Sequence, residues 1–247
     1  MKGIMKMWNC GKERTSDIGL QTSEVRSRKS EVLSLAAAGY RPKFVGIWQK
    51  SNLDAAGVRQ PDDWTYHSGI AGAAIVATAK SVGFVDNMPR YLDSVGYPDI
   101  ITLCIGENDF ILNKKGAAET FKNFVALVSA TAAKRPNAKI IGTTLPPVSN
   151  NQNATRKVLE FNKILTTEYA KAGHGELPDN FYLLDFIAIL QNLVQSGKVP
   201  RDLKGYCARD AHPNWKGHDL IARAFAEKIS EVCRKASQVQ PAAEPLD

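Results

Sequence analysis

The chain has 247 residues, of which 44% are hydrophobic and 23% charged, and its formal net charge is +7. This length accommodates one full-sized α/β domain and leaves too little for a second. No apolar run reaches the length that spans a bilayer, because Lys, Asp or Gly interrupts the best candidates within about ten residues. We therefore expect a soluble protein with a single domain at residues 1–237 and a disordered tail at 238–247.

Five short apolar segments have the length of buried strands. In chain order they are Ile4–Trp8, Lys43–Trp48, Asp99–Ile105, Lys139–Thr144 and Phe181–Phe186. Apolar residues at helical spacing lie between or after them, at 22–39, Ile70–Val82, Ala117–Ala133, Arg156–Lys171 and Trp215–Lys235. This alternation predicts an α/β fold, a three-layer α/β/α sandwich with a central parallel sheet of about five strands.

The N-terminal fifth of the chain is basic. Residues 1–50 carry ten Lys and Arg against four acidic residues, a net charge of +6. Such a stretch suits either an anionic partner or an ordinary solvated surface. Because neither interleaved aromatic residues nor a nucleic-acid-binding motif accompanies the charge, we favour the solvated surface and do not expect nucleic acid as a partner.

The cysteines and the N-terminus give further expectations. Cys10, Cys104, Cys207 and Cys233 stand far apart without a Cys-Xaa-Xaa-Cys pair, so we expect no metal site and no cofactor. Whether Cys10, Cys207 and Cys233 are free or bridged stays open. The first lysines are not followed by the hydrophobic stretch of a signal peptide, which favours the cytoplasm by default and leaves secretion after signal removal open.

The tetrapeptide Gly106-Glu107-Asn108-Asp109 follows the third predicted strand directly. Functional loops of parallel sheets gather at the carboxyl ends of the strands. There the Asn108 carboxamide could donate to a developing oxyanion. The alternative is that the tetrapeptide is an ordinary turn that leaves the strand.

The segment Asp210-Ala211-His212-Pro213-Asn214 precedes the last predicted helix. A carboxylate that orients an imidazole is the usual way to activate a hydroxyl or thiol nucleophile. Asp210 and His212 would therefore form a base pair, provided that the segment turns. The alternative is that Asp210 and Asn214 cap the ends of elements and His212 is a plain loop residue.

A third glycine-containing segment precedes the predicted helix at Ile70–Val82. Gly69 and Gly72 could expose backbone N–H groups at a positive helix end, where an anion is stabilised. The alternative reading is close packing of that helix.

These segments, taken together, resemble the SGNH hydrolase superfamily, also called GDSL-type esterases. Gly72, Gly106–Asp109 and Asp210–Asn214 are similar to the second, third and fifth sequence blocks of that family. The similarity extends to Phe44-Val45-Gly46, Leu145-Pro146-Pro147 and Asn162, and so covers nearly the whole chain.

The resemblance implies a flavodoxin-like α/β/α fold and an esterase-type hydrolase. It implies that His212 is the general base, that Asp210 orients it, and that Asn108 and the Gly72 N–H donate to the oxyanion. The implied substrate is a small-molecule or carbohydrate ester, with an O-acetyl ester on a carbohydrate as the first expectation. The oligomeric state stays open.

The first block of the family departs from this pattern, because its Gly-Asp-Ser occurs nowhere in the chain. Alignment on the first strand puts Asn9-Cys10 in its place and makes Cys10 a candidate thiol nucleophile. Alignment on the following helix puts Ser16-Asp17-Ile18 there instead. The nucleophile is therefore Cys10, Ser16 or absent, and if it is absent the chain is a catalytically silent SGNH-like ligand-binding protein.

Overall fold

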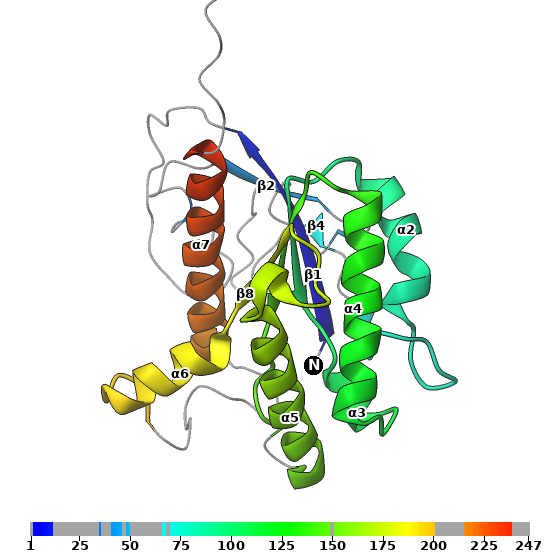
Figure 1. The fold of residues 1–247 in the computed structure, drawn as a ribbon, viewed down its shortest axis with the longest axis vertical. Coiled ribbons are helices and arrows are strands. Elements are labelled where there is room, and N and C mark those ends of the chain that lie inside the picture. Colours follow the sequence, from blue (N-terminus) through cyan, green and yellow to red (C-terminus); the bar gives the residue numbers. More distant parts are fainter. Residues whose placement is uncertain are drawn as a thin grey trace, which may run out of the picture.

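The computed structural model describes residues 2–11, 35, 41–45, 48–49, 66–67, 70–148, 151–200 and 215–238. Within them, helices lie on both sides of a central sheet (Figure 1). The strands are β1 Lys2–Gly11, β2 Arg41–Val45, β3 Trp48–Gln49, β4 Tyr66–His67, β5 Ile70–Ala71, β6 Ile100–Cys104, β7 Lys139–Thr143 and β8 Phe181–Leu184. The helices are α2 Phe84–Val95, α3 Glu107–Ile111, α4 Ala117–Lys134, α5 Gln152–Tyr169, the 3₁₀ helix η2 Ala172–His174, α6 Phe186–Gln195 and α7 Trp215–Gln238.

The main sheet has the strand order β2-β1-β6-β7-β8, with β5 paired to β1. Strands β6, β7 and β8 are parallel, whereas β1 is antiparallel to β2, β5 and β6. Strands β3 and β4 form a separate antiparallel pair. The predicted α/β/α class is confirmed, and all five predicted strands form, but fewer of them run parallel than expected.

The direction of β1 accounts for this difference. Ile4 pairs with Cys104 and Trp8 with Ile100, so the start of β1 is level with the carboxyl end of β6. Side chains alternate between the two faces of a strand with a period of two residues, whether the neighbouring strand is parallel or antiparallel. The apolar pattern of residues 4–8 therefore predicts a strand without predicting its direction.

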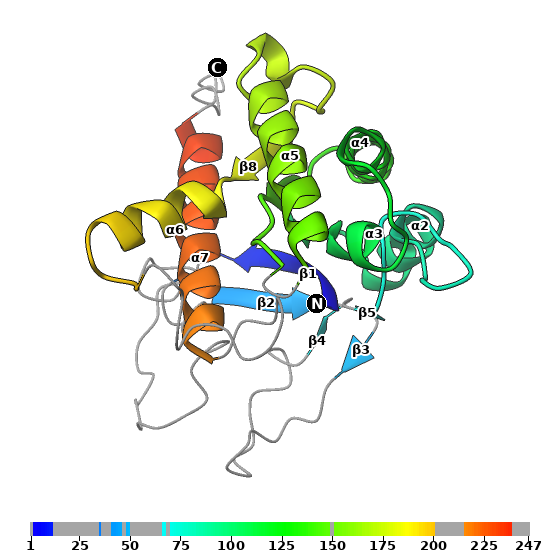
Figure 2. The same ribbon diagram turned by 90° about the horizontal axis from the view of Figure 1, so that it is seen from below.

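Two hydrophobic cores cover the two faces of the sheet. In β6, Ile101 and Leu103 belong to one core, whereas Ile100 belongs to the other. The first core contains residues of α2, α4 and α5, including Met88, Leu92, Phe124, Leu127, Phe161 and Leu165. The second contains residues of α7, including Phe225, Ile229 and Val232. The view from below shows α7 on one side of the molecule and α2 and α4 on the other (Figure 2), as expected for strands that are apolar on both faces.

A chain of aromatic rings joins α3 to the centre of the first core. Phe110 packs edge-on against Phe161, which packs against Phe124, which packs against Phe181, with ring centroids 5.9–6.0 Å apart. Gly142 makes room for it, because a Cβ there would lie 2.6 Å from the Phe181 ring. Such ring pairs contribute about 0.5–1.5 kcal/mol each beyond area burial.

The predicted helix at Ile70–Val82 is wrong. The segment instead forms β5, a turn at Gly72 with φ +73°, and two isolated β-bridges, Ala74 with Gly83 and Thr78 with Ser81. The helix begins only at Phe84, after Gly83 in an extended conformation. Tertiary contacts override the helical spacing here, because backbone groups of 73–75 bond to side chains of α3 and not to one another.

The predicted helices Ala117–Ala133, Arg156–Lys171 and Trp215–Lys235 are confirmed as α4, α5 and α7. The predicted helix at 22–39 lies outside the described residues, apart from Leu35, which is helical and buried. Helices α2, α3 and α6 were not predicted. Of the disordered tail expected at 238–247, Gln238 is the last residue of α7, and residues 239–247 lie outside the described part of the chain.

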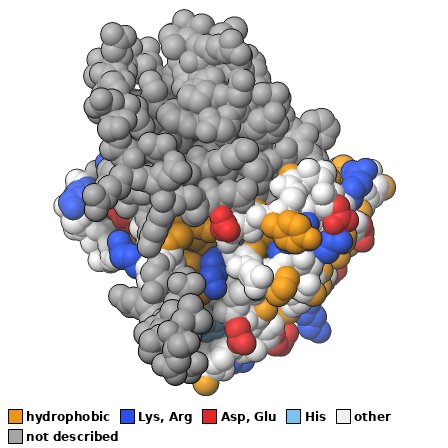
Figure 3. Space-filling model, turned by 90° about the horizontal axis from the view of Figure 1, so that it is seen from above, with side chains coloured by type: hydrophobic (Ala, Val, Ile, Leu, Met, Phe, Trp, Pro, Cys, Tyr) orange, Lys and Arg blue, Asp and Glu red, His pale blue; other side chains and the backbone are white. Residues whose placement is uncertain are grey.

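Cys104 and Cys233 are half-buried and form no disulfide. No helix among the described residues is long and apolar enough to cross a membrane. Within the same residues, no three His, Cys, Asp or Glu side chains gather closely enough to hold a metal ion. Figure 3 shows the end of the molecule opposite α3, where basic, acidic and hydrophobic side chains are interspersed over the described surface.

Candidate active site

The loop after β6 sits at the carboxyl end of the parallel strands, where α3 begins (Figure 1). Gly106 is the last residue of this loop before α3 and has φ +125°, a backbone conformation that L side chains rarely adopt. A Cβ at Gly106 would also lie 3.3 Å from the Leu145 side chain. Both constraints require glycine, and they fix how the chain turns from β6 into Glu107 and Asn108.

Asn108 is buried, and its side chain is anchored to the segment after β5. Its Nδ2 donates a hydrogen bond of 2.7 Å to the carbonyl oxygen of Ala73. This bond fixes the plane of the carboxamide and therefore the direction of its second N–H. A preorganised donor of this kind stabilises a developing oxyanion without reorganising during the reaction.

Gly72 immediately precedes Ala73, so the structure brings the two predicted oxyanion residues to the same place. Gly72 follows β5, which pairs with the first residues of β1. Its expected setting, the opening of a helix, is not found, because the chain turns at Gly72 and forms no helix until Phe84. Any anion-binding role of the Gly72 N–H would therefore depend on this turn and not on a helix dipole.

Asp109 binds the same segment from the next position of α3. Its side chain is 0% exposed, and its Oδ2 accepts a 2.9 Å hydrogen bond from the backbone N–H of Ile75. Burial raises the pKa of the Asp109 carboxyl from 3.8 to about 6, although the Ile75 N–H and the charge of Lys115 oppose the rise. From the sequence, Asp109 is expected only as part of a motif or turn, and its position next to Asn108 is the available signal for a further role.

Glu107 is also buried, at 4% exposure. Burial raises the pKa of its carboxyl above the usual 4.5. Asn108 is therefore flanked by two carboxyl groups, each of which holds a proton more tightly than in water.

A polar cluster ties the same two loops together further out. Thr78 Oγ1 donates to Asn113 Oδ1 at 2.8 Å, and Asn113 Nδ2 donates to Ser81 Oγ at 3.0 Å. Thr78 and Ser81 belong to the segment between β5 and α2, and Asn113 follows α3. The segment that starts at Gly72 is thus attached to the α3 loop at both of its ends.

Asn162, which the resemblance singled out, holds the loop after β7. Its Oδ1 accepts from the N–H of Leu145 and its Nδ2 donates to the carbonyl of Leu145, both at 2.8 Å. Asn162 therefore pairs with one residue of the loop as another backbone strand would. Because Leu145 also approaches Gly106, this pairing fixes the loop after β7 beside the loop after β6.

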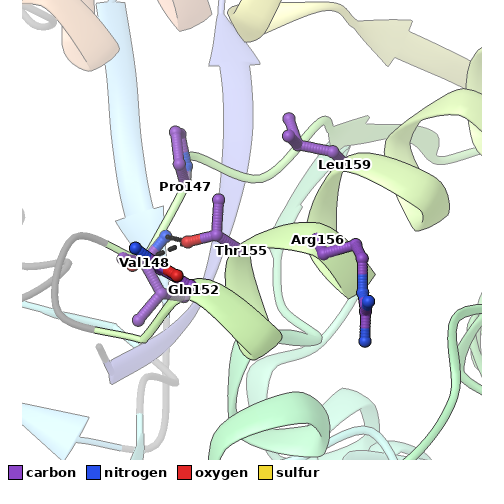
Figure 4. Close-up of a pocket in the computed structure, with 6 residues that line it drawn as sticks. All are labelled: Pro147, Val148, Gln152, Thr155, Arg156 and Leu159. Carbon is purple, nitrogen blue, oxygen red and sulfur yellow. Dashed lines mark hydrogen bonds between the residues drawn. The ribbon is translucent and has the colours of Figure 1, made fainter.

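A pocket of about 450 Å³ opens beside that loop. Pro147 and Val148 line it from the loop, and Gln152, Thr155, Arg156 and Leu159 line it from α5 (Figure 4). Thr155 Oγ1 donates to the carbonyl of Val148 and accepts from its N–H, which ties the loop to α5. Leu159 is 47% exposed, so apolar surface stays accessible there.

Asp185 is the N-cap of α6. Its Oδ1 accepts from the N–H of Ala188 in the first turn of α6 and from the hydroxyl of Thr144. These bonds satisfy the start of α6 and link β8 to the loop after β7.

The remaining predicted site residues are not brought to Asn108 by the described structure. Asp210, His212 and Ser16 lie outside the described residues. The backbone of Cys10 pairs with Pro42, beyond Trp8, which pairs with Ile100 at the amino end of β6. Six residues separate Cys10 from Ile4, the residue level with the end of β6, which corresponds to about 20 Å along a strand. Because of this direction of β1, Cys10 lies near the amino end of β6, whereas Asn108 follows its carboxyl end.

The fold and the loop after β6 define an α/β/α protein with a buried, preoriented carboxamide at the carboxyl edge of its sheet. The sequence pattern of the GDSL-like Lipase/Acylhydrolase family matches residues 31–220. The chain belongs to this family and is an esterase-type hydrolase of the SGNH superfamily. The matched region includes Gly72, Asn108 and His212, whereas Cys10 and Ser16 precede it.

Solved structures of similar fold include a carbohydrate esterase family 3 protein from Talaromyces cellulolyticus. It is 18% identical, the match covers 84% of this chain and 89% of that one, and the TM-score is 0.60. A second is a mutant acetyl esterase crystallised with an acetate ion, which is 17% identical, with 84% and 92% of the two chains covered and a TM-score of 0.57. At this identity the likeness concerns the fold. No curated protein matches the sequence.

Proposed function

We propose that this protein hydrolyses a carboxylic ester by acyl transfer at the loop between β6 and α3. The observation that carries the proposal is the bond from Asn108 Nδ2 to Ala73, which holds the carboxamide one residue from Gly72. In the proposed reaction a nucleophile attacks the carbonyl carbon, and Asn108 and the Gly72 N–H stabilise the resulting oxyanion. The carbon–oxygen bond then breaks, the alcohol leaves, and water hydrolyses the acyl-enzyme.

We assign His212 as the base that takes the proton of the nucleophile and passes it to the leaving alcohol, and Asp210 as the group that orients it. The start of α7 supports this assignment. Helix α7 begins at Trp215, three residues after His212, and this end of α7 is the one nearer to the level of α3 in Figure 1.

Two residues remain candidates for the nucleophile, Cys10 and Ser16. The direction of β1 does not favour Cys10, because it separates Cys10 from Asn108 by the length of the strand. Substitution distinguishes them: Cys10→Ala abolishes turnover and labelling by a thiol-directed probe if the thiol attacks, whereas Ser16→Ala does so for a serine-directed probe if the hydroxyl attacks.

For the substrate we propose an O-acetyl ester on a carbohydrate. The names of the two similar structures support an acetyl group and a sugar. The pocket beside α5 supports the sugar, because Pro147 and Leu159 offer aliphatic surface for the C–H faces of a ring. Gln152 and Arg156 offer hydrogen bonds for its hydroxyl groups.

The test is hydrolysis of an acetylated oligosaccharide and of nitrophenyl acetate by the purified chain. Asn108→Ala should lower kcat about 10²- to 10³-fold, the usual effect of losing one oxyanion donor. Asn192→Ala, at an exposed position of α6, is the matched control and should leave kcat unchanged. Hydrolysis that survives both Asn108→Ala and His212→Ala would overturn the proposal.

The absence of Gly-Asp-Ser and the placement of Cys10 support one alternative, a silent ligand-binding protein with this fold. Calorimetric binding of an acetylated oligosaccharide without any turnover would establish the alternative. Turnover that depends on Asn108 would exclude it.

A further inference from the structure

Two consecutive residues of α3 grip one short segment of backbone. Asn108 donates to the carbonyl of Ala73, and Asp109 accepts from the N–H of Ile75. The two bonds lie on either side of Ala74, and they engage one backbone acceptor and one backbone donor. Together they fix both the position and the rotation of residues 73–75 relative to α3.

We propose that Asp109 is a positioning residue of the oxyanion hole. It holds the segment after Gly72 so that the Gly72 N–H and the Asn108 carboxamide face one point. Asp109 itself is 0% exposed and does not reach the substrate. The inference rests on the proposed ester hydrolysis, and it adds a residue whose contribution is geometric.

The anchor of Asp109 is rigid on the side of α3. The next residue, Phe110, is 2% exposed and packs edge-on against Phe161 of α5. The backbone carbonyl of Asp109 accepts from the N–H of Lys115 at 2.9 Å. Because α3 is held in this way, the hydrogen bond from the Ile75 N–H to Asp109 fixes residues 73–75 relative to α3.

The ionisation of Asp109 should matter for this grip. A carboxylate is a stronger acceptor for an N–H than a carboxylic acid or an amide. The second oxygen, Oδ1, is buried without a hydrogen-bond partner among the described residues, so a proton placed there would have no acceptor in that part of the chain. Because burial brings the pKa of Asp109 to about 6, the grip should weaken as the pH falls through this value.

Four charged side chains among the described residues lie on the elements next to Asp109. They are Glu107 on α3, Lys115 on the loop before α4, Glu119 on α4, which pairs with Lys115 at 2.6 Å, and Lys157 on α5, whose Nζ donates to the carbonyl of Lys114. Lys115 favours the ionised carboxylate of Asp109, while its pairing with Glu119 offsets part of that effect. Glu107 is the other carboxyl that titrates in a buried position beside Asn108.

The experiment compares Asp109→Ala with Asp109→Asn in the full chain. The alanine variant loses the acceptor, whereas the asparagine variant keeps an acceptor for the Ile75 N–H and cannot ionise. We expect Asp109→Ala to lower kcat about 10- to 100-fold with KM within about twofold, as misplaced catalytic groups do. Asp109→Asn should restore kcat to within about threefold of wild type, because the bond to Ile75 is kept.

Two further readouts separate positioning from general stability. Exchange of the Ile75 amide with solvent should accelerate by about tenfold or more in Asp109→Ala but not in Asp109→Asn. On the acid limb, kcat/KM of the wild type should fall more steeply than that of Asp109→Asn, because Glu107 is present in both proteins and only the wild type also takes up a proton at Asp109. Thr131→Val, which removes the buried bond from Thr131 to Leu127 within α4, is the control and should change the melting temperature without changing kcat.

Each outcome decides one claim. A wild-type protein without esterase activity defeats the proposed function. An active wild type whose kcat, Ile75 exchange and acid limb are all unchanged in Asp109→Ala leaves the proposed function standing and defeats the role of Asp109. Equal losses in Asp109→Ala and Asp109→Asn, with Ile75 still protected in both, also defeat that role.

Discussion

Removal of the Asn162 side chain should destabilise the whole protein, although Asn162 is polar and belongs to no hydrophobic cluster. Its carboxamide satisfies both the N–H and the carbonyl of Leu145, and both residues are buried. In Asn162→Ala the N–H and the carbonyl of Leu145 lose their hydrogen-bond partner while they remain buried. Each unsatisfied buried group costs about 1–3 kcal/mol, so the expected loss is about 2–6 kcal/mol. This is a large part of the roughly 5–15 kcal/mol that stabilises a typical domain.

The assay is equilibrium unfolding in urea, with Asn153→Ala as the control at an exposed position of the same helix. A companion variant, Asn162→Asp, keeps the acceptor for the Leu145 N–H but sets a carboxylate against the Leu145 carbonyl. It should be destabilised at pH 7 and partly recover near pH 4, because a protonated carboxyl regains the donor. The reasoning is refuted if Asn162→Ala loses less than about 1 kcal/mol, the net value of one ordinary hydrogen bond.

Three further outcomes can be measured. Gly142→Ala should lower the free energy of unfolding by about 1–3 kcal/mol by overpacking, since its Cβ would lie 2.6 Å from Phe181, and an unchanged urea midpoint would contradict this. The Asp109 carboxyl binds protons more tightly in the folded than in the unfolded state, so it lowers wild-type stability as the pH rises from about 4 to 6, by up to about 3 kcal/mol. The free energies of unfolding of wild type and Asp109→Asn should be compared in urea at pH 4 and pH 7. The stability of the wild type relative to Asp109→Asn should be higher at pH 4 than at pH 7, and equal relative stabilities at the two pH values would contradict this. Arg156→Ala should raise KM for an acetylated oligosaccharide about 3- to 10-fold with kcat unchanged, because it removes a charged hydrogen-bond donor from the pocket rim; equal KM values would remove Arg156 from the binding site.

The sequence predicts the sheet well because its information is local. Ile100, Ile101 and Leu103 form an apolar run, and alternate residues of that run enter the two cores. Asn108 was also predicted from its place directly after that strand. The local sequence does not determine strand direction, because the pattern of Ile4–Trp8 fits a parallel or an antiparallel strand. Nor does it show tertiary hydrogen bonds that compete with a helix, such as those from α3 to the backbone of 73–75 within Ile70–Val82.

The same distinction explains which site residues could be predicted. Asn108 and Gly72 carry signals in their own neighbourhood, a strand end and a glycine turn. The contribution of Asp109 depends on a residue 34 positions away in the chain, and the pairing of Asn162 with Leu145 spans 17 positions. Such contacts become apparent only when the loops are seen side by side, because no periodic pattern accompanies them.

The row of rings from Phe110 to Phe181 has a consequence for how such a protein can diverge. Helix α3, which carries Asn108, packs through Phe110 against the rings at the centre of the first core, so most substitutions there would destabilise the whole fold. The rim of the pocket lies on the exposed side of α5, where substitutions usually change stability by less than about 0.5 kcal/mol. New preferences for the alcohol part of an ester could therefore be acquired at Gln152, Arg156 and Leu159 while the reaction itself is inherited unchanged.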